Sequence, residues 1–331
     1  MANVLIKSGS YRNAPIVNMS FPLVRDYQEG AKGGYVTVDG TSMGRDRIRI
    51  TVEPDQYEID GQVTAPIVAA KVEESDEAIM ERIGERFDIM DSMTQAVVDG
   101  VVRSMIVVGP PGVGKSFNVV KKLEEANLFN MIGGDIRFEV VKGATTALGL
   151  YAKLYGYSKE GDVLVFDDCD SILMDELSLN ILKAALDTNK KRTIHWNSDS
   201  KLLQREGIPN KFDFKGACIF ITNIKFDSIR STKLRDHLSA LESRSHYIDL
   251  TMNTMRDKLL RIKQIARTGE LFKGYNFQNG EDQEILTFME ECQGRLREMS
   301  LRCAVKLADL RKTMPMNWKR TAEVTLMKNA F

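Results

Sequence analysis

The feature of this sequence that most constrains its fold is the glycine-rich stretch GPPGVGKS at residues 109–116. It follows the apolar, strand-like segment SMIVV and precedes FNVVKKLEEA, whose apolar residues have helical spacing. The stretch fits the pattern G-x-x-x-x-G-K-[ST] between a strand and a helix, where a loop wraps phosphate groups with its backbone N–H groups. A glycine-rich turn without a ligand is the alternative. The pattern and both flanking elements agree with the phosphate loop, so we expect a nucleotide site.

The chemistry of such a site gives each part of the stretch a role. Lys115 can reach the β and γ phosphates, and the Ser116 hydroxyl can complete the coordination shell of Mg²⁺. The N-terminus of the following helix adds partial positive charge. The sequence thus predicts a nucleoside triphosphate and Mg²⁺ as ligands, with the nucleotide held by Gly109, Pro110, Pro111, Gly112, Val113, Gly114, Lys115, Ser116 and Phe117.

Three stretches of the chain differ in pattern, with boundaries near residues 76 and 250. Residues 1–75 contain period-two segments at 35–38 and 47–53, which predict a small β-rich domain of unknown role. Residues 76–250 alternate short apolar strands with helices, which predicts an α/β domain with a parallel sheet sandwiched by helices. Residues 251–331 have only helical stripes and predict a small all-α domain. The expected sheet strands are 104–108, 137–141, 163–166, 217–222 and 247–250.

Two acids follow one of these strands directly, in VLVFDD at residues 163–168. A nucleoside triphosphatase needs an acid at the tip of a buried strand beside the phosphate loop. We expect Asp167 to hold Mg²⁺ together with Ser116, and Asp168 to orient the attacking water. The alternative is that these acids only cap the next helix, a role that Asp170 fits better.

GPPGVGKS followed by VLVFDDCD resembles the Walker A and Walker B motifs of the AAA+ family of ATPases, over about residues 76–312. In that family a polar residue called sensor 1 ends the next strand and contacts the γ phosphate and water, a position that Asn223 matches. An arginine finger reaches the nucleotide of the neighbouring subunit, and Arg244 in ALESRSHYIDL matches it. Arg235 and Arg230 are the alternatives for the finger.

The helical lid of the family carries sensor 2, an arginine in a G-x-x-R pattern, which Arg297 matches. Arg295 and Arg302 are its alternatives, and for each arginine a solvated surface position is the other interpretation. The family usually has Glu where this sequence has Asp168, so slow hydrolysis is compatible with the pattern. A finger that acts in trans implies a homo-oligomer, in this family a hexameric ring or spiral.

Composition restricts the partners only weakly. Lysine plus arginine and aspartate plus glutamate number 46 each, so no global charge draws the chain to nucleic acid. Residues 251–331 have a surplus of basic residues. The apolar runs are too short to span a membrane, and the N-terminus lacks the pattern of a signal peptide. We therefore expect a cytoplasmic protein without a membrane partner, in the host cytoplasm if it is virally encoded.

Four scattered cysteines and three histidines give no zinc-ligand spacing, so we interpret the cysteines as core residues. The compact chain, without an appended nuclease or protease, resembles stand-alone AAA+ proteins of phages and mobile elements.

Three segments bear on the substrate. Residues 141–162 contain Leu148, Leu150, Tyr151, Tyr155 and Tyr157, which could grip a polypeptide or stack on bases, or could form an ordinary amphipathic helix. The segment around Trp196 is basic, and Arg45, Arg47 and Arg49 alternate along a strand. We favour nucleic acid or nucleoprotein as the substrate. A protein substrate, or an ATP-gated scaffold with little hydrolysis, is the alternative.

Overall fold

The computed structural model describes residues 3–12, 14–30, 33–59, 74–130, 137–278 and 280–328. The chain divides into two compact units, Met1–Glu74 and Ser75–Phe331. Residues 60–73 of the expected N-terminal domain and the last three residues of the expected helical domain lie outside the described residues. None of the helices in the described ranges is long and apolar enough to cross a membrane.

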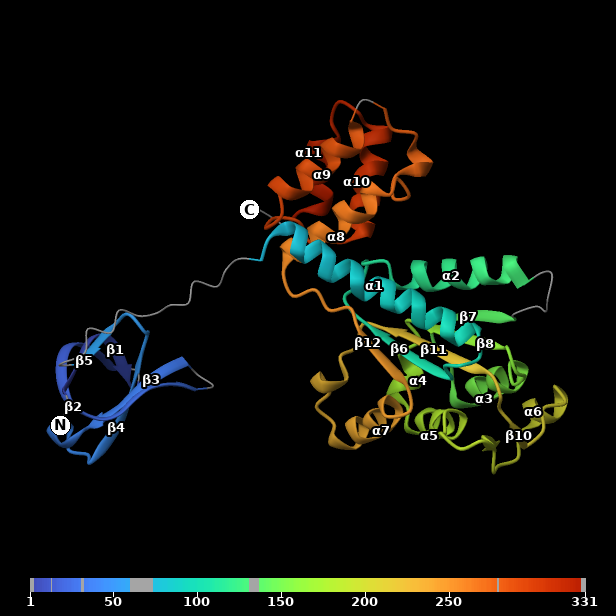
Figure 1. The fold of residues 1–331 in the computed structure, drawn as a ribbon, viewed down its shortest axis with the longest axis horizontal. Coiled ribbons are helices and arrows are strands. Elements are labelled where there is room, and N and C mark those ends of the chain that lie inside the picture. The colour runs from blue at the N-terminus through green and yellow to red at the C-terminus, as the bar shows by residue number, and fades with distance from the viewer. Residues whose placement is uncertain are drawn as a thin grey trace. The chain divides into compact units, whose positions relative to one another are not determined.

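The N-terminal unit is a small antiparallel β-barrel (Figure 1). Its long second strand pairs with the first strand over its early part and with the third over its later part, and the fourth strand pairs back to the first. Alternate residues such as Val4, Ile6, Ile48 and Ile50 point into the core, since successive strand side chains face opposite sides. The strands are β1 (Asn3–Tyr11), β2 (Ala14–Gly30), β3 (Gly33–Asp39), β4 (Arg47–Val52) and β5 (Tyr57–Ile59).

The second unit contains the parallel five-stranded sheet that the sequence predicts, so the α/β fold class is confirmed. Its strand order is β12-β6-β11-β8-β7, and every neighbouring pair is parallel. The carboxyl ends of all the strands therefore meet at one edge, where open α/β sheets bind ligands. The strands are β6 (Ser104–Val108), β7 (Phe138–Lys142), β8 (Val163–Asp167), β11 (Ala217–Thr222) and β12 (His246–Asp249).

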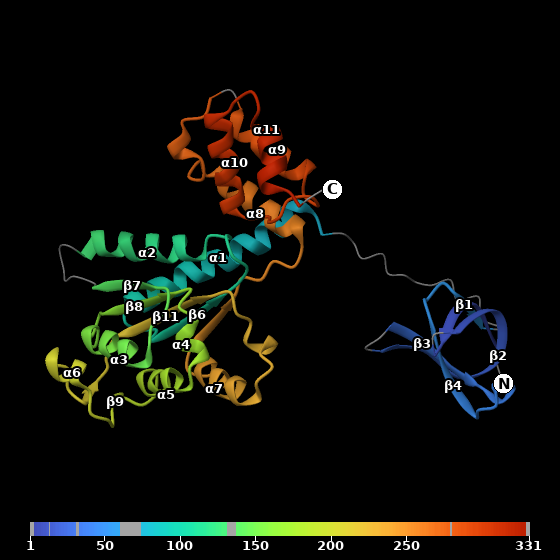
Figure 2. The ribbon, with the colours of Figure 1, turned by 180° about the vertical axis from the view of Figure 1, so that it is seen from behind.

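Helices cover both faces of this sheet (Figures 1 and 2). Met105 and Val107 of β6 join α1 and α2 in one core, whereas Ile106 and Val108 join the helices of the opposite face in another. The continuous apolar runs of the strands follow from this burial on two sides. The covering helices are α1 (Asp76–Val98) and α2 (Lys115–Asn130) on one face, and α3 (Ala147–Gly156), α4 (Ser171–Met174), α5 (Glu176–Ala185) and α7 (Thr232–Glu242) on the other.

A small module, β9 (Thr193–His195), α6 (Lys201–Arg205) and β10 (Lys211–Asp213), is inserted before β11 and packs on α3. Tyr151 of α3 is fully buried, and its hydroxyl donates to the Pro209 carbonyl oxygen at 2.8 Å. Its ring lies 5.6 Å from that of Trp196. Tyr151 and Leu150 therefore cannot grip a substrate, and the alternative of an ordinary amphipathic helix is correct for them.

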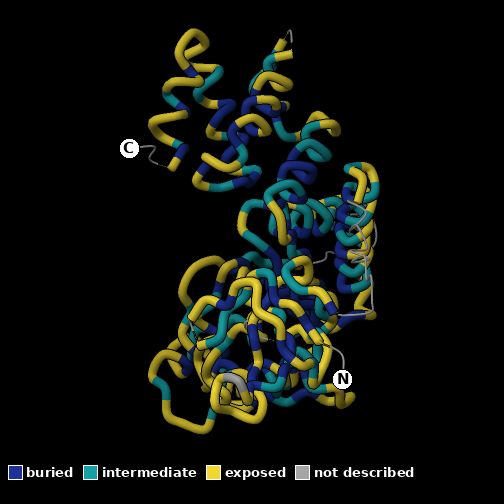
Figure 3. The backbone as a smooth tube through the Cα atoms, turned by 90° about the vertical axis from the view of Figure 1, so that its left-hand side faces the viewer, coloured by how far each residue is buried: buried dark blue, intermediate teal, exposed yellow. Residues whose placement is uncertain are grey.

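Four helices, α8 (Met255–Arg267), α9 (Glu281–Glu291), α10 (Leu301–Thr313) and α11 (Trp318–Leu326), form the C-terminal part of the second unit. They enclose their own core, which includes Ile285, Leu307 and Trp318. Figure 3 shows buried turns on the inner sides of these helices and exposed turns on the outer sides. The spacing of apolar residues predicts α8, α10 and α11.

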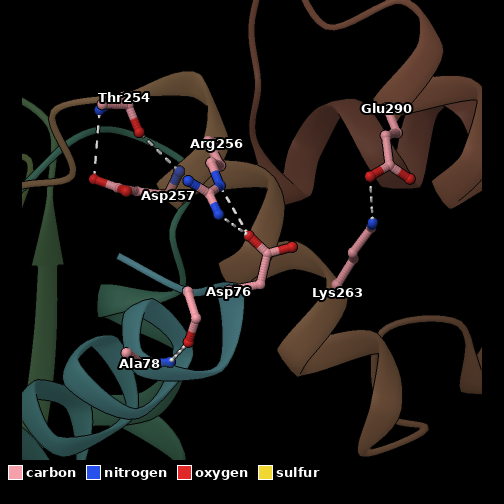
Figure 4. A network of polar contacts seen from close by, with 8 residues as sticks. Asp76, Ala78, Thr254, Arg256, Asp257, Lys263 and Glu290 are labelled. Atoms are coloured by element: carbon pink, nitrogen blue, oxygen red, sulfur yellow. Dashed lines mark hydrogen bonds and ion pairs between the residues drawn. The ribbon is translucent and has the colours of Figure 1, made fainter. Parts of the chain in front are cut away.

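Polar contacts fix where α1 and α8 begin and hold them together (Figure 4). The Asp76 carboxylate at the start of α1 forms a 2.6 Å ion pair with Arg256 of α8. Thr254 and Asp257 form a capping box at the N-terminus of α8, and Lys263 joins α8 to Glu290 of α9 at 2.8 Å. The helical part is thereby anchored on α1, next to the carboxyl edge of the sheet.

Candidate functional site

The loop of residues 109–116 leaves the carboxyl end of β6 and leads into α2. Gly112 has a φ of 70°, and a Cβ atom there would lie 2.7 Å from Cβ of Ser300. Only glycine satisfies both the left-handed backbone and this close approach. The Leu301 N–H donates to the Gly112 carbonyl oxygen at 2.7 Å, so the N-terminus of α10 rests directly on the loop.

Lys115 lies at the centre of the site and is only 6% exposed. Its Nζ donates to the carbonyl oxygens of Gly109 at 2.7 Å and Pro110 at 2.9 Å, and to Oδ1 of Asn223 at 2.7 Å. Burial lowers the pKa of Lys115 to about 8, and Asp168 and Asp167 offset part of that shift. The ammonium group is held by neutral oxygens in a low-dielectric setting, where a phosphate anion would stabilise its charge.

Asp167 ends β8 and is 4% exposed. Its Oδ1 accepts a hydrogen bond from Ser116 Oγ at 2.6 Å, and its Oδ2 lies 3.2 Å from Lys142 Nζ. A carboxylate and a hydroxyl side by side are the oxygen ligands that Mg²⁺ prefers. Lys142 is absent from the site predicted from sequence. It ends β7 in register with Asp167, so its place at the end of a neighbouring strand is the signal that could have identified it.

Asp168 is exposed and has a φ of 52°, which is uncommon for a residue other than glycine. Asn223, directly after β11, donates from Nδ2 to Asp168 Oδ1 at 3.0 Å, so the two predicted residues do meet. The predicted capping role of the Asp170 side chain is wrong. Asp170 precedes α4 without a side-chain capping bond, and its carboxylate accepts from Thr222 Oγ1 at 2.7 Å instead.

Two adjoining cavities open at this edge of the second unit. One of about 240 Å³ is lined by loop residues, Lys115, Asp168, Asn223 and Arg302. The other, of about 590 Å³, lies between α1, α2 and α8. Both include Gly114, Phe117 and Leu301 in their walls. The first has the polar groups that a triphosphate needs, and the second is larger and more apolar.

Arg261 gives the larger cavity a polar wall. It is 7% exposed, and its guanidinium carbon lies 3.5 Å from the ring centre of Phe87. Burial lowers the pKa of Arg261 to about 10. Its Nη1 donates to Gln264 Oε1 at 2.8 Å, while its buried Nε has no hydrogen-bond partner within the described ranges. A donor and an aromatic ring thus line a cavity next to the phosphate loop.

The three arginines that the sequence offers for sensor 2 differ in their distance from the phosphate cavity, since only one of them lines it. Arg302, in the first turn of α10, lines the cavity beside Lys115. The Arg297 backbone N–H donates to the Leu326 carbonyl oxygen, and Arg297 does not line that cavity. Arg295 contacts Cys292 Sγ at 3.3 Å. Arg302 is therefore the arginine of the helical part that the structure brings to Lys115.

Arg244 lies just after α7, where its Nη1 donates to the Ala240 carbonyl oxygen at 2.6 Å. Neither Arg244 nor the exposed alternatives Arg230 and Arg235 line either cavity at the sheet edge. A residue that acts on the nucleotide of another subunit need not line the cavities of its own chain. The finger therefore stays a prediction.

No family model matches this chain. It is 34% identical over 290 residues to an uncharacterised 36.7 kDa protein from the nrdC–mobD intergenic region of enterobacteria phage T4, a match that covers 87% of this chain and 85% of the phage protein. The chain belongs to the family of this T4 protein. The matched length of 290 residues exceeds that of the unit Ser75–Phe331, so similarity to the T4 protein extends into the N-terminal unit.

Among solved structures, the chain is similar to the ORC2 protein of Aeropyrum pernix. The ADP form is 13% identical with a TM-score of 0.42, over 73% of this chain and 68% of that chain. The structure of its ADPNP–ADP complexes is 11% identical with a TM-score of 0.43, over 74% of this chain and 67% of that chain.

Proposed function

We propose that this chain is an AAA+ ATPase that binds ATP with Mg²⁺ and hydrolyses it. The observation that carries the proposal is the convergence of Lys115, Ser116, Asp167 and Asn223 within hydrogen-bonding distance at the carboxyl edge of the sheet. They come from three separate segments, the start of α2, the end of β8 and the residue after β11, so their meeting supports the motif interpretation independently of the sequence pattern.

In this proposal the 109–116 loop and the N-terminus of α2 surround the β and γ phosphates. Lys115 binds them with its ammonium, while Ser116 and Asp167 hold Mg²⁺, which would neutralise charge that develops on the phosphates. Arg302 also lines the phosphate cavity and would contact the γ phosphate, the sensor 2 role for which the G-x-x-R pattern indicated Arg297. The larger adjoining cavity would take the nucleoside, with Phe87 and Arg261 beside the base.

Asp168 and Asn223 would position the attacking water. Their 3.0 Å hydrogen bond orients one Asp168 oxygen, and the left-handed backbone of Asp168 directs a short side chain into the site. Since an aspartate reaches one methylene less far than a glutamate, hydrolysis would be slow. An ATP-gated scaffold with little turnover is therefore the second candidate function. It predicts oligomerisation on ATP binding without phosphate release.

The remaining parts of the proposal concern assembly and substrate. Residues 1–75, 76–250 and 251–331 would be the N-terminal, nucleotide-binding and lid domains of a homo-oligomer, a ring or spiral of about six subunits. Arg244 would act on the neighbouring nucleotide. Nucleic acid or nucleoprotein is the proposed substrate, and remodelling of a protein is the alternative. A phage T4 relative fits a place in the host cytoplasm.

The test is ATP binding and phosphate release by the wild type, Lys115→Ala and Lys153→Ala. Lys115→Ala should abolish turnover, because it removes the buried cation at the phosphates. Lys153, in a surface ion pair with Glu139 of β7, is the matched control and should keep wild-type turnover. Turnover that survives Lys115→Ala would overturn the assignment. ATP binding without turnover by the wild type would favour the scaffold.

A further inference from the structure

We propose that the outer face of β2, β3 and β4 in the N-terminal barrel binds single-stranded nucleic acid, with Arg25, Arg47 and Arg49 on phosphates and Tyr35 stacked on a base. The inference deepens the proposed function, on which it rests for the class of substrate. It assigns that substrate to a surface in the unit Met1–Glu74, which the nucleotide site does not use.

Strand register gathers the three arginines on one face. In β4, Ile48, Ile50 and Val52 are buried, so Arg47 and Arg49 point outward. Thr37 of β3 pairs with Arg49 on one side and with Arg25 on the other.

Strand spacing sets the distances between these side chains. Strands about 4.8 Å apart separate the Cα atoms of Arg25 and Arg49 by roughly 10 Å. The two-residue step from Arg47 to Arg49 is about 6.7 Å at a rise of about 3.3–3.4 Å per residue. These spacings let each arginine contact a separate phosphate of one strand.

The arginines on this face are available for an anionic partner. Within the described part of the chain, Arg25, Arg47 and Arg49 are exposed and none of them forms an ion pair. The acid opposite Arg47 is Asp39, whose carboxylate accepts hydrogen bonds from the Thr41 backbone N–H at 2.8 Å and from the Thr41 hydroxyl. These bonds are the main cause that lowers the pKa of Asp39, and the charge of Arg47 adds to the shift without forming an ion pair with Asp39 in the described part of the chain.

An aromatic ring lies beside Arg49 on this face and favours unpaired bases. The Arg49 guanidinium carbon is 5.0 Å from the ring centre of Tyr35, and the Tyr35 hydroxyl donates to Gln28 Oε1 at 3.1 Å. A ring that is fixed at its hydroxyl end and half-exposed can stack on a base, and an adjacent arginine adds a cation–π contribution. Duplex DNA keeps its bases stacked on one another, so this combination selects a single strand. None of the contacts requires a 2′-hydroxyl.

The test measures fluorescence anisotropy of labelled oligo(dT) and oligo(U) with the full chain, without ATP, over a series of salt concentrations. For Arg25→Ala/Arg47→Ala/Arg49→Ala we expect at least a tenfold weaker affinity at low salt. The slope of log affinity against log salt should fall by about 2, since each phosphate contact with a single strand contributes about 0.7. Tyr35→Ala should weaken binding at least fivefold, a loss at the low end of the range for base stacking, and leave the slope unchanged.

Arg12→Ala is the matched control, because Arg12 is an exposed barrel arginine that also lies over a tyrosine, Tyr11, at 5.6 Å. It should change affinity less than twofold, and melting temperatures by circular dichroism should show that all variants fold. Wild-type binding by the triple variant, equal losses in Arg12→Ala, or binding of a polypeptide but of neither oligonucleotide would overturn the inference. Repeating the titration with Lys115→Ala separates this inference from the proposed ATPase activity. If Lys115→Ala still binds the oligonucleotides, the inference is supported, even if neither the wild type nor the variant hydrolyses ATP.

Discussion

The carboxyl edge of the parallel sheet and the outer face of the N-terminal barrel both gather charged side chains, but under opposite physical conditions. At the sheet edge, Lys115 is 6% and Asp167 4% exposed, and both are held by hydrogen bonds of 2.6–2.9 Å. On the barrel, Arg47 and Arg49 are exposed and lack ion-pair partners among the described residues.

This difference sets how each region responds to mutation and to salt. Electrostatic interactions are strong and poorly screened when they are buried, and weak and screened when they are exposed. At the sheet edge each buried charged group should therefore be indispensable. On the barrel the contributions should be small, additive and dependent on salt.

The largest effect should come from Asp167→Asn, which keeps the shape of the side chain and removes its charge. Turnover should fall on the order of 100-fold or more, because Mg²⁺ contributes several kcal/mol to stabilising the transition state. Phosphate release measured over a series of Mg²⁺ concentrations checks this. Asp175→Asn is the matched control, since Asp175 caps α5 away from the site and should alter stability only. If Asp167→Asn kept a turnover within about tenfold of the wild type, the buried Asp167 would behave like a surface group, and the contrast between buried and exposed charges would be contradicted.

An intermediate effect should distinguish the two arginines of the helical part. Arg302→Ala should lower turnover by about 10- to 100-fold, since a charged donor aimed at the γ phosphate acts mainly in the transition state. Arg297→Ala, outside the phosphate cavity, should change turnover by less than about twofold, as most surface substitutions do. Measuring kcat and KM for ATP in both variants shows which of the two arginines acts on the nucleotide. The opposite ranking would return the sensor 2 role to Arg297.

The sequence predicted the chemistry at the sheet edge because that chemistry is local. A strand followed by GPPGVGKS and a strand followed by two acids place Lys115 and Asp167 at the same edge once the strands are parallel. Their partners depend on other segments. Lys142 becomes visible only when β7 is known to lie beside β8 in that register.

The choice of Arg302 over Arg297 depends on where a helix begins. The G-x-x-R pattern pointed to Arg297, but α10 begins at Leu301 behind the Ser300 cap, and its first turn rests on Gly112. A Ser N-cap two residues before an arginine was the local signal for this placement.

The closure of the barrel through the pairing of β1 with β4 joins residues about 40 positions apart in the chain, and no local pattern specifies that register.

The smallest effect, and the one that separates burial from location, should come from Lys142→Met. Lys142 contacts the buried Asp167 carboxylate at 3.2 Å, yet its own side chain is 66% exposed. An exposed ion pair contributes up to about 1 kcal/mol, so its ammonium should compete with Mg²⁺ for Asp167 only weakly. We expect the Mg²⁺ concentration for half-maximal turnover to fall by up to about fivefold, with kcat unchanged. A large loss of kcat would mean that Lys142 positions Asp167. Location at the sheet edge, and not burial, would then decide how much a charge matters in this protein.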